Sequence, residues 1–311
     1  MHRFTRIFGS LSICAAPFLL VAAKPAPAPA PFVPALAYKY GPEEIRLSNA
    51  DGTQAVLLVR KPRGDSILWL SLAPLSQRRA AYIEATNSGT VRSLRIVSWA
   101  QQATGGLAIT IDAQPMLASQ NTGMALADVD FSPDGSQLAV LLTDYNSNSE
   151  LRLFDVASRQ QVGQAIPLIG QAMSLSWRPS DNSILLRGPN GVFSYKNGTQ
   201  THLFDEPNQG SELDAFNGTA LDVILPYKDY PIQGNLVQRW DGLTVNGGSP
   251  VLTMITANGI WPNMSCDNSR MIYTELGAKR TAYNLVLATG AKVFFSKDSN
   301  VQRMTYPNSC S

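Results

Sequence analysis

Histidine and cysteine are scarce in this sequence, which removes several kinds of catalytic and metal centre. The chain has two histidines, His2 and His202, and three cysteines, Cys14, Cys266 and Cys310. Beyond residue 23, a Ser–His–Asp triad would depend on His202 alone. Two cysteines and one distant histidine also cannot complete a closed tetrahedral zinc site. We therefore predict no catalytic residue of these kinds.

Motifs of the common enzyme classes are absent as well. The chain contains no G-x-S-x-G elbow, no H-E-x-x-H pair, no phosphate-binding loop and no G-x-G-x-x-G turn. These absences favour a protein without catalytic activity. One enzymatic alternative, based on carboxylates, is described below.

An excess of positive charge and a second long apolar run are also missing. The signal-like N-terminus holds two of the 25 Lys and Arg residues, so those that remain only balance the 23 Asp and Glu. Because nucleic-acid binding depends on clustered basic residues, we expect no nucleic-acid partner. No run of 18 apolar residues follows residue 23, so we expect no membrane span in the exported chain.

The first 34 residues have the pattern of an export signal followed by a tether. Arg3 and Arg6 precede an uncharged apolar stretch, and small residues at 21 and 23 fit a signal-peptidase site. An uncleaved membrane anchor is the alternative. Alternating prolines favour an extended tether after the signal. We predict a signal peptide at 1–23, a tether at 24–34 and one periplasmic or extracellular domain, expected to be a monomer, at 35–311.

A repeated unit is clearest at residues 129–162, VDFSPDGSQLAVLLTDYNSNSELRLFDVASRQQV. The SPDG segment is a turn, because proline presets φ, aspartate caps the backbone and glycine accepts positive φ. QLAVLLT is an apolar run typical of a buried strand, and ELRLFDV alternates as a half-buried strand does. The unit therefore predicts four short antiparallel strands.

The first strand of each unit ends at an apolar residue that we call the anchor. The anchors are Leu72, Phe131, Trp177, Phe216, Met264 and Tyr306. Their spacings of 59, 46, 39, 48 and 42 residues suit the blades of a β-propeller, with an insertion in the first interval. We expect that interval to hold outer strands and a longer loop.

One unit lacks its first strand. Residues 35–59 match only the second, third and fourth strands of a blade, and residues 301–306 supply a first strand at the other end of the chain. We therefore predict an all-β, six-bladed β-propeller whose closing blade combines both segments. Pairing of this kind joins the last blade to the first. In an oxidising compartment, a Cys266–Cys310 disulfide would hold the closing strand, with differently paired or reduced cysteines as the alternative.

The segments FSPDGSQLAVLL (131–142), NMSCDNSRMIYTE (263–275) and EIRLSNADGTQAVLL (44–58) resemble repeats of TolB-type and WD-repeat-like β-propellers of exported bacterial proteins. The resemblance extends over nearly all of residues 35–310. The TolB family also carries an N-terminal α/β domain. Here the repeats begin directly after the tether, so the family's docking role in the cell envelope does not transfer with the fold.

Two kinds of site follow from the predicted ring. Segments that lead into the first strands converge at one mouth of the central channel, and loops that join second to third strands lie at the same face, at 143–150, 227–234 and 275–282. For a binding or scaffold protein that recognises a protein, peptide or glycan, we expect rigid aromatic and basic groups on this face. The candidates are Tyr145, Tyr227, Tyr230, Trp261 and Arg303.

The alternative is a metal-dependent hydrolase, lactonase or lyase with its site in the channel. Ca²⁺ or another divalent ion needs several oxygen ligands, which loop carboxylates and amides can supply. The candidates are Asp128, Glu212, Asp214 and Asn263. The binding function requires no cofactor.

Overall fold

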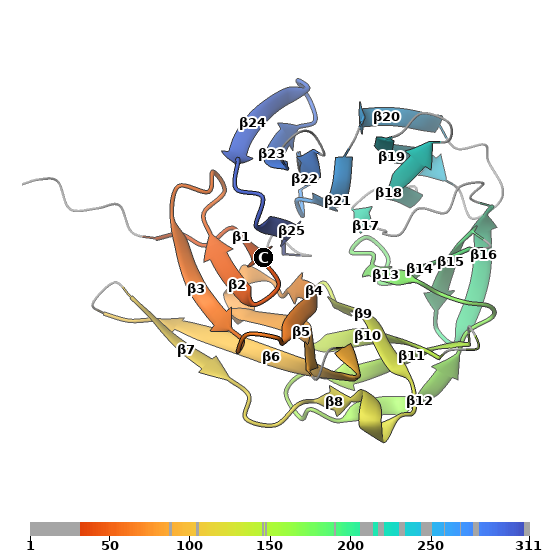
Figure 1. The fold of residues 1–311 in the computed structure, drawn as a ribbon. Coiled ribbons are helices and arrows are strands. Elements are labelled where there is room, and N and C mark those ends of the chain that lie inside the picture. Colours follow the sequence, from red (N-terminus) through yellow and green to blue (C-terminus); the bar gives the residue numbers. More distant parts are fainter. Residues whose placement is uncertain are drawn as a thin grey trace, which may run out of the picture. The chain divides into compact units, whose positions relative to one another are not determined.

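Short apolar segments separated by polar turns form antiparallel β-strands along the described chain (Figure 1). The computed structural model describes residues 32–86, 89–103, 106–144, 146, 148–189, 191–205, 214–216, 221–229, 234–243, 251–257, 259–267, 269–275 and 280–307. Residues Phe32–Ser311 belong to one compact unit. Within the described part of this unit the strands form six sheets.

Five sheets have four strands each. They are β25 (Val301–Thr305) with β1 (Leu36–Tyr40), β2 (Glu44–Ser48) and β3 (Ala55–Arg60); β9 (Ala125–Phe131), β10 (Gln137–Thr143), β11 (Ser149–Asp155) and β12 (Gln161–Pro167); β13 (Ser174–Trp177), β14 (Ile184–Gly188), β15 (Gly191–Lys196) and β16 (Thr199–Phe204); β17 (Asp214–Phe216), β18 (Leu221–Asp229), β19 (Gly234–Leu243) and β20 (Val251–Ala257); and β21 (Gly259–Met264), β22 (Arg270–Glu275), β23 (Thr281–Val286) and β24 (Ala291–Ser296).

The predicted count of six blades is wrong: five sheets are four-stranded blades, and the remaining sheet has five strands. It contains β4 (Ser66–Leu72), β5 (Arg79–Thr86), β6 (Val91–Gln101), β7 (Leu107–Ile111) and β8 (Leu117–Ala118). The sequence predicted a loop after the outer strands. Instead the chain returns to the long strand β6, where Ser93 and Leu94 pair with Ala118 and Leu117 of β8. The outer position is thus shared by β7 and β8, so five four-stranded blades remain.

The closing sheet joins the two ends of the repeat region, as the sequence predicted. Strand β25 lies antiparallel to β1, with Ala37 opposite Thr305 and Tyr38 opposite Met304. The Tyr40 hydroxyl also donates to Asp298 Oδ2 at 2.6 Å, just before β25. Residues more than 250 positions apart in sequence therefore complete one sheet.

The turn after the first strand is the most regular part of the repeat. In the sheet of β9, Ser132 Oγ donates to Asp134 Oδ1 at 2.6 Å, and the same aspartate oxygen accepts the Ser136 N–H at 3.0 Å. In the sheet of β21, Ser265 and Asp267 make the corresponding contact at 2.6 Å. These hydroxyl contacts lower the pKa values of both aspartates. The Ser-x-Asp pattern therefore fixes the turn in both copies.

The first strands of successive sheets contact one another in a closed series: β4, β9, β13, β17, β21, β25 and β4 again. The hydrophobic core lies between neighbouring sheets. One cluster joins Ile83 and Leu94 to Phe131 and Val140, and another joins Leu141 to Trp177. Across the described residues, no helix has the length and apolar character required to span a membrane.

Candidate functional site

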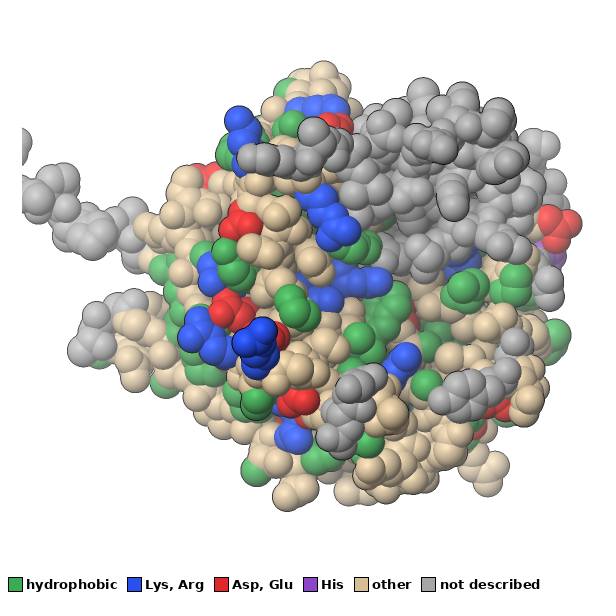
Figure 2. Space-filling view, in the orientation of Figure 1, with side chains coloured by type: hydrophobic (Ala, Val, Ile, Leu, Met, Phe, Trp, Pro, Cys, Tyr) green, Lys and Arg blue, Asp and Glu red, His purple; other side chains and the backbone are tan. Residues whose placement is uncertain are grey.

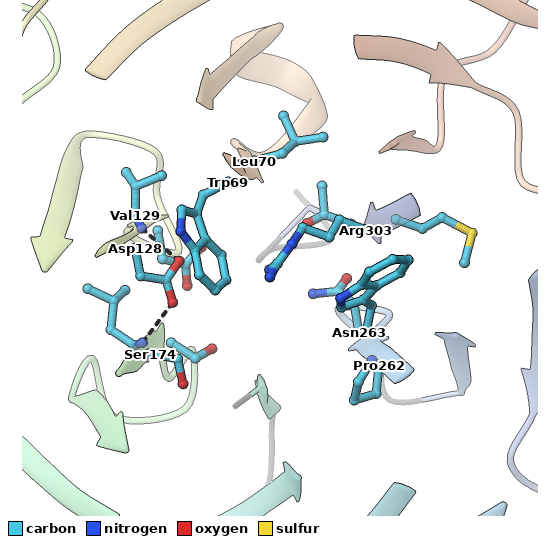
Figure 3. A pocket seen from close by; sticks show the side chains of 14 residues that line it. Trp69, Leu70, Asp128, Val129, Ser174, Pro262, Asn263 and Arg303 are labelled. Atoms are coloured by element: carbon cyan, nitrogen blue, oxygen red, sulfur yellow. Dashed lines mark hydrogen bonds between the residues drawn. The ribbon is translucent and has the colours of Figure 1, made fainter. Parts of the chain in front are cut away.

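A central pocket of about 80 Å³ lies among the first strands of five sheets (Figure 3). We call it the central pocket. It is lined by Trp69, Leu70, Asp128, Val129, Asp130, Ser174, Leu175, Ser176, Trp261, Pro262, Asn263, Arg303, Met304 and Thr305.

Each of these five strands contributes the residue three positions before its anchor. These ring residues are Trp69, Asp128, Ser174, Trp261 and Arg303. They come from β4, β9, β13, β21 and β25. One position of the repeat therefore supplies two indoles, a carboxyl group, a hydroxyl group and a guanidinium to one pocket.

β-Bulges aim two of the ring residues. The register between β1 and β25 shifts at Arg303, and the register between β21 and β22 shifts across Trp261 and Pro262. Arg303 has a φ of 40° and Trp261 a φ of 53°. A left-handed backbone is unfavourable for bulky side chains and persists only where the surrounding structure requires it. Bulges of this kind re-aim a side chain.

The Arg303 side chain lies beside Trp69 in the pocket (Figure 3) and is near both indoles. Its guanidinium carbon is 3.6 Å from the centroid of the Trp69 ring and 5.9 Å from that of Trp261. Arg280 approaches the Trp261 ring to 5.4 Å. Such cation–π contacts hold a charged group against a flat apolar wall. The pocket thus has a cation whose position is fixed by stacking.

Asp128 places a buried carboxyl group in the same pocket. Its Oδ1 accepts the Val129 N–H at 2.8 Å, and its Oδ2 accepts the Leu175 N–H at 2.9 Å. The side chain is almost fully buried, and burial raises the pKa of Asp128 to about 8, although these backbone donors and Arg303 act to lower it. Asp128 is therefore largely protonated at neutral pH.

A second set of polar residues holds neighbouring sheets together, and each of them directly precedes an anchor. Ser71 Oγ accepts the N–H of the next anchor, Phe131, at 3.2 Å. Asp130 Oδ2 accepts the N–H of Trp177 at 2.7 Å. Asn263 Oδ1 accepts the N–H of Tyr306 at 2.5 Å. We call Ser71, Asp130 and Asn263 the staple residues, because each satisfies a backbone donor on the next sheet.

Four residues predicted from the sequence meet in the central pocket: Trp261 and Arg303 from the binding set, and Asp128 and Asn263 from the metal set. Tyr145, Tyr230, Glu212 and Cys310 lie outside the described residues. For Tyr227 and Asp214 the described part is the strand alone, β18 and β17, without the side chain. Their roles stay predictions.

The oxygens proposed as metal ligands have protein partners. Both carboxyl oxygens of Asp128 accept backbone N–H groups, and Asn263 Oδ1 accepts the Tyr306 N–H. A divalent ion would have to compete with these donors and with the nearby Arg303 charge. Within the described ranges, no three His, Cys, Asp or Glu side chains are grouped so that they could hold a metal ion.

Sequence reasoning missed two ring residues, Trp69 and Ser174. Trp69 lies in an apolar strand and has the appearance of a core residue, while Ser174 is a small residue among many. The signal was the alignment on the anchors, since both stand at the offset of Asp128, Trp261 and Arg303. Counting back from each anchor would have found them.

Comparison with known proteins bears on the fold. No protein-family model matches the chain, and no curated protein sequence matches it. Among solved structures, the chain is similar to TolB from Acinetobacter baumannii, with a TM-score of 0.61 and 17% identity over 89% of this chain and 67% of that one. The fold is that of a β-propeller.

A second similar structure comes from a nidogen/laminin complex. The TM-score is 0.60 with 9% identity, covering 89% of this chain and 99% of the other. Identities this low show a shared fold and say nothing about shared ligands.

Proposed function

We propose that this protein is an exported, non-catalytic binding module that presents the central-pocket face of its propeller to a partner. The partner class is a protein, peptide or glycan, and the pocket favours a protein or peptide. The observation that carries the proposal is the convergence of Trp69, Trp261 and Arg303 in one pocket. Tryptophan and arginine dominate binding hot spots in protein interfaces.

An exposed apolar side chain adjoins the pocket lining in sequence. Met173 immediately precedes the ring residue Ser174 and is 40% exposed. In the view of Figure 2, hydrophobic and basic side chains both reach the surface near the middle. Apolar side chains together with arginine and tryptophan are typical of a protein-binding surface.

The fold comparisons and the N-terminal pattern support this reading. One similar propeller occurs in a complex of nidogen with laminin, so the fold is compatible with a protein-binding role. The signal pattern of residues 1–23 supports a periplasmic or extracellular location. The exported domain is proposed to be a monomer. The stacked Arg303 adds specificity for an acidic or hydrogen-bond-accepting group.

The proposal is tested by site-specific photo-crosslinking in the native host. A photoreactive amino acid at Met173 reports on the pocket face, and one at Val162, on the outer strand β12, is the matched control, because the two side chains are 40% and 41% exposed. We expect a discrete cross-linked species from Met173 only, which Trp261→Ala abolishes. Equal cross-linking at both positions, or none at Met173, would refute a binding role for this face.

A further inference from the structure

The buried hydroxyl of Ser174 has no hydrogen-bond partner among the residues that the structure describes. Ser174 is 1% exposed, its Oγ makes no hydrogen bond, and it lines the central pocket. Buried polar groups without partners are rare, because their desolvation is not compensated. An unpartnered buried hydroxyl on a residue that lines a pocket indicates that a bound ligand supplies the missing hydrogen-bond partner.

The same pocket also holds one cation at a fixed position. Among the fourteen residues that line the pocket, Arg303 is the single basic one. Stacking on Trp69 uses the face of the guanidinium, whereas its five N–H donors lie in its plane. The strained backbone at Arg303 and the bulge around it hold the group in this position.

The two acidic residues of the pocket are bound by donors of the protein wall. Asp128 accepts the N–H groups of Val129 and Leu175, and Asp130 accepts donors from Ser71 and Trp177. Their carboxyl groups therefore face backbone and hydroxyl donors, while Arg303 is the basic group of the pocket lining and Ser174 adds a hydroxyl donor. This polarity favours an anion of low charge over a cation.

The volume limits the size of that anion. About 80 Å³ admits a group of a few heavy atoms, not a sugar ring or an aromatic side chain. A carboxylate is planar and monoanionic, fits between two flat indoles, and pairs with a guanidinium in its plane. A phosphate is tetrahedral and carries more charge, which the neighbouring Asp130 carboxylate would repel more strongly than it repels a monoanion.

We propose that the central pocket binds a carboxylate group, which Arg303 pairs with and Ser174 donates to, between the rings of Trp69 and Trp261. The inference rests on the proposed function, since it names the chemical group that the binding face recognises. The carboxylate has two sources, a free small acid or the C-terminus of a peptide.

The test follows the tryptophan fluorescence of the purified exported chain at pH 7.5, since two of its five tryptophans line the pocket. Sodium acetate is titrated at constant ionic strength, with acetamide and inorganic phosphate as comparison ligands. We expect saturable binding of acetate, none of acetamide and weaker binding of phosphate. Absence of saturation by any carboxylate probe, or tighter binding of phosphate, would overturn the proposal.

Three variants separate recognition from folding. Arg303→Gln should abolish saturation, and Arg60→Gln, at an exposed arginine outside the pocket, should leave it unchanged. Ser174→Ala should weaken acetate binding by about tenfold, the loss of one charge-assisted hydrogen bond, while the melting temperature stays within error because the hydroxyl has no protein partner. Unchanged acetate affinity in both pocket variants would refute the assignment.

Two further probes distinguish the sources of the carboxylate and the two proposals. If triglycine binds at least tenfold more tightly than acetate and triglycine amide does not bind, the source of the carboxylate is a peptide C-terminus. Equal affinities identify a free small acid. If the Met173 cross-link persists in Arg303→Gln and in saturating acetate, the binding face stands and the carboxylate site fails.

Discussion

Replacing Asp130 with alanine tests whether the staple residues hold the ring of sheets together. The Asp130 carboxylate accepts Ser71 Oγ at 2.7 Å, Phe131 N–H at 3.0 Å and Trp177 N–H at 2.7 Å. It therefore connects three successive sheets from a buried position. Truncation leaves a cavity and removes all three acceptor contacts at once.

The expected loss follows from which donors find another acceptor. Phe131 N–H also contacts Ser71 Oγ at 3.2 Å, so it keeps a partner, whereas Trp177 N–H loses its acceptor. The Trp177 N–H would be buried without an acceptor, and the hydrogen bonds to the Asp130 carboxylate would be lost. We therefore expect the free energy of unfolding to decrease by about 2–4 kcal/mol. Asp130→Ser should recover part of this loss, because Ser71 performs the same role with a hydroxyl in the preceding sheet.

The assay is urea unfolding followed by tryptophan fluorescence, with Asp155→Ala as the matched control. Asp155 also accepts two hydrogen bonds, from the N–H and Oγ of Ser158 at 2.7 Å each, but in an exposed turn. We expect the control to lose less than about 1 kcal/mol. Equal losses for the two alanine variants, or a loss below about 1 kcal/mol for Asp130→Ala, would refute the stapling argument.

Three other predictions use the pocket and the closing strand. The pKa of Asp128 is raised from 3.8 to about 8 in the folded state, so the native protein retains a proton that the unfolded chain releases. The free energy of unfolding should therefore fall as the pH rises from about 4 to 8, by at most about 1.4 kcal/mol per pH unit. Urea titrations of Asp128→Asn should show a smaller dependence of stability on pH. Ser substitution of Cys266 or Cys310 should cost about 2–4 kcal/mol under oxidising conditions only, and non-reducing peptide mapping should recover the linked pair. Melting temperatures in EDTA and in Ca²⁺, Mg²⁺ or Zn²⁺ should agree; a metal-dependent rise lost in Asp128→Ala would favour the hydrolase alternative instead.

The closing sheet could be predicted because a strand was missing at a definite place. Residues 35–59 contain the turn and strand pattern of a repeat without its first strand, and residues 301–306 contain a first strand without the rest. Alternating apolar residues and Ser-x-Asp turns are local signals, so they survive in a single sequence. The contact of Tyr306 N–H with Asn263 then brings the closing strand to the sheet whose first turn, between β21 and β22, contains Cys266.

The five-stranded sheet could not be predicted, since its extra strand has only two residues. Leu117 and Ala118 pair with β6 because that strand is 11 residues long and β7 covers only its C-terminal half. The pairing depends on the length of a neighbouring strand and on the path of the chain, and neither leaves a periodic pattern in residues 102–118.

The ring positions show why three of the five ring residues were visible in the sequence. Asp128, Trp261 and Arg303 attract attention as charged or aromatic residues near the start of a strand. Trp69 and Ser174 do not, because a tryptophan in an apolar strand and a single serine both have ordinary structural roles. Only the positions of the anchors, which are a property of the fold, make the five residues equivalent.

The staple and ring positions divide two tasks between neighbouring sites on one strand. In β9 and β13, residues two apart face the same side by regular strand alternation, so the residue before the anchor and the residue three before it share one side. In β21 and β25, bulges direct Trp261 and Arg303 to the pocket instead. The residue before the anchor accepts a backbone hydrogen bond from the next sheet in the three staple residues. The residue three before the anchor makes side-chain contacts in the pocket in Trp69, Trp261 and Arg303. Asp128 does both, through its contact with Leu175. Because stability depends mainly on one position and recognition on the other, substitutions at Trp261 or Arg303 should change binding while the ring of sheets stays closed.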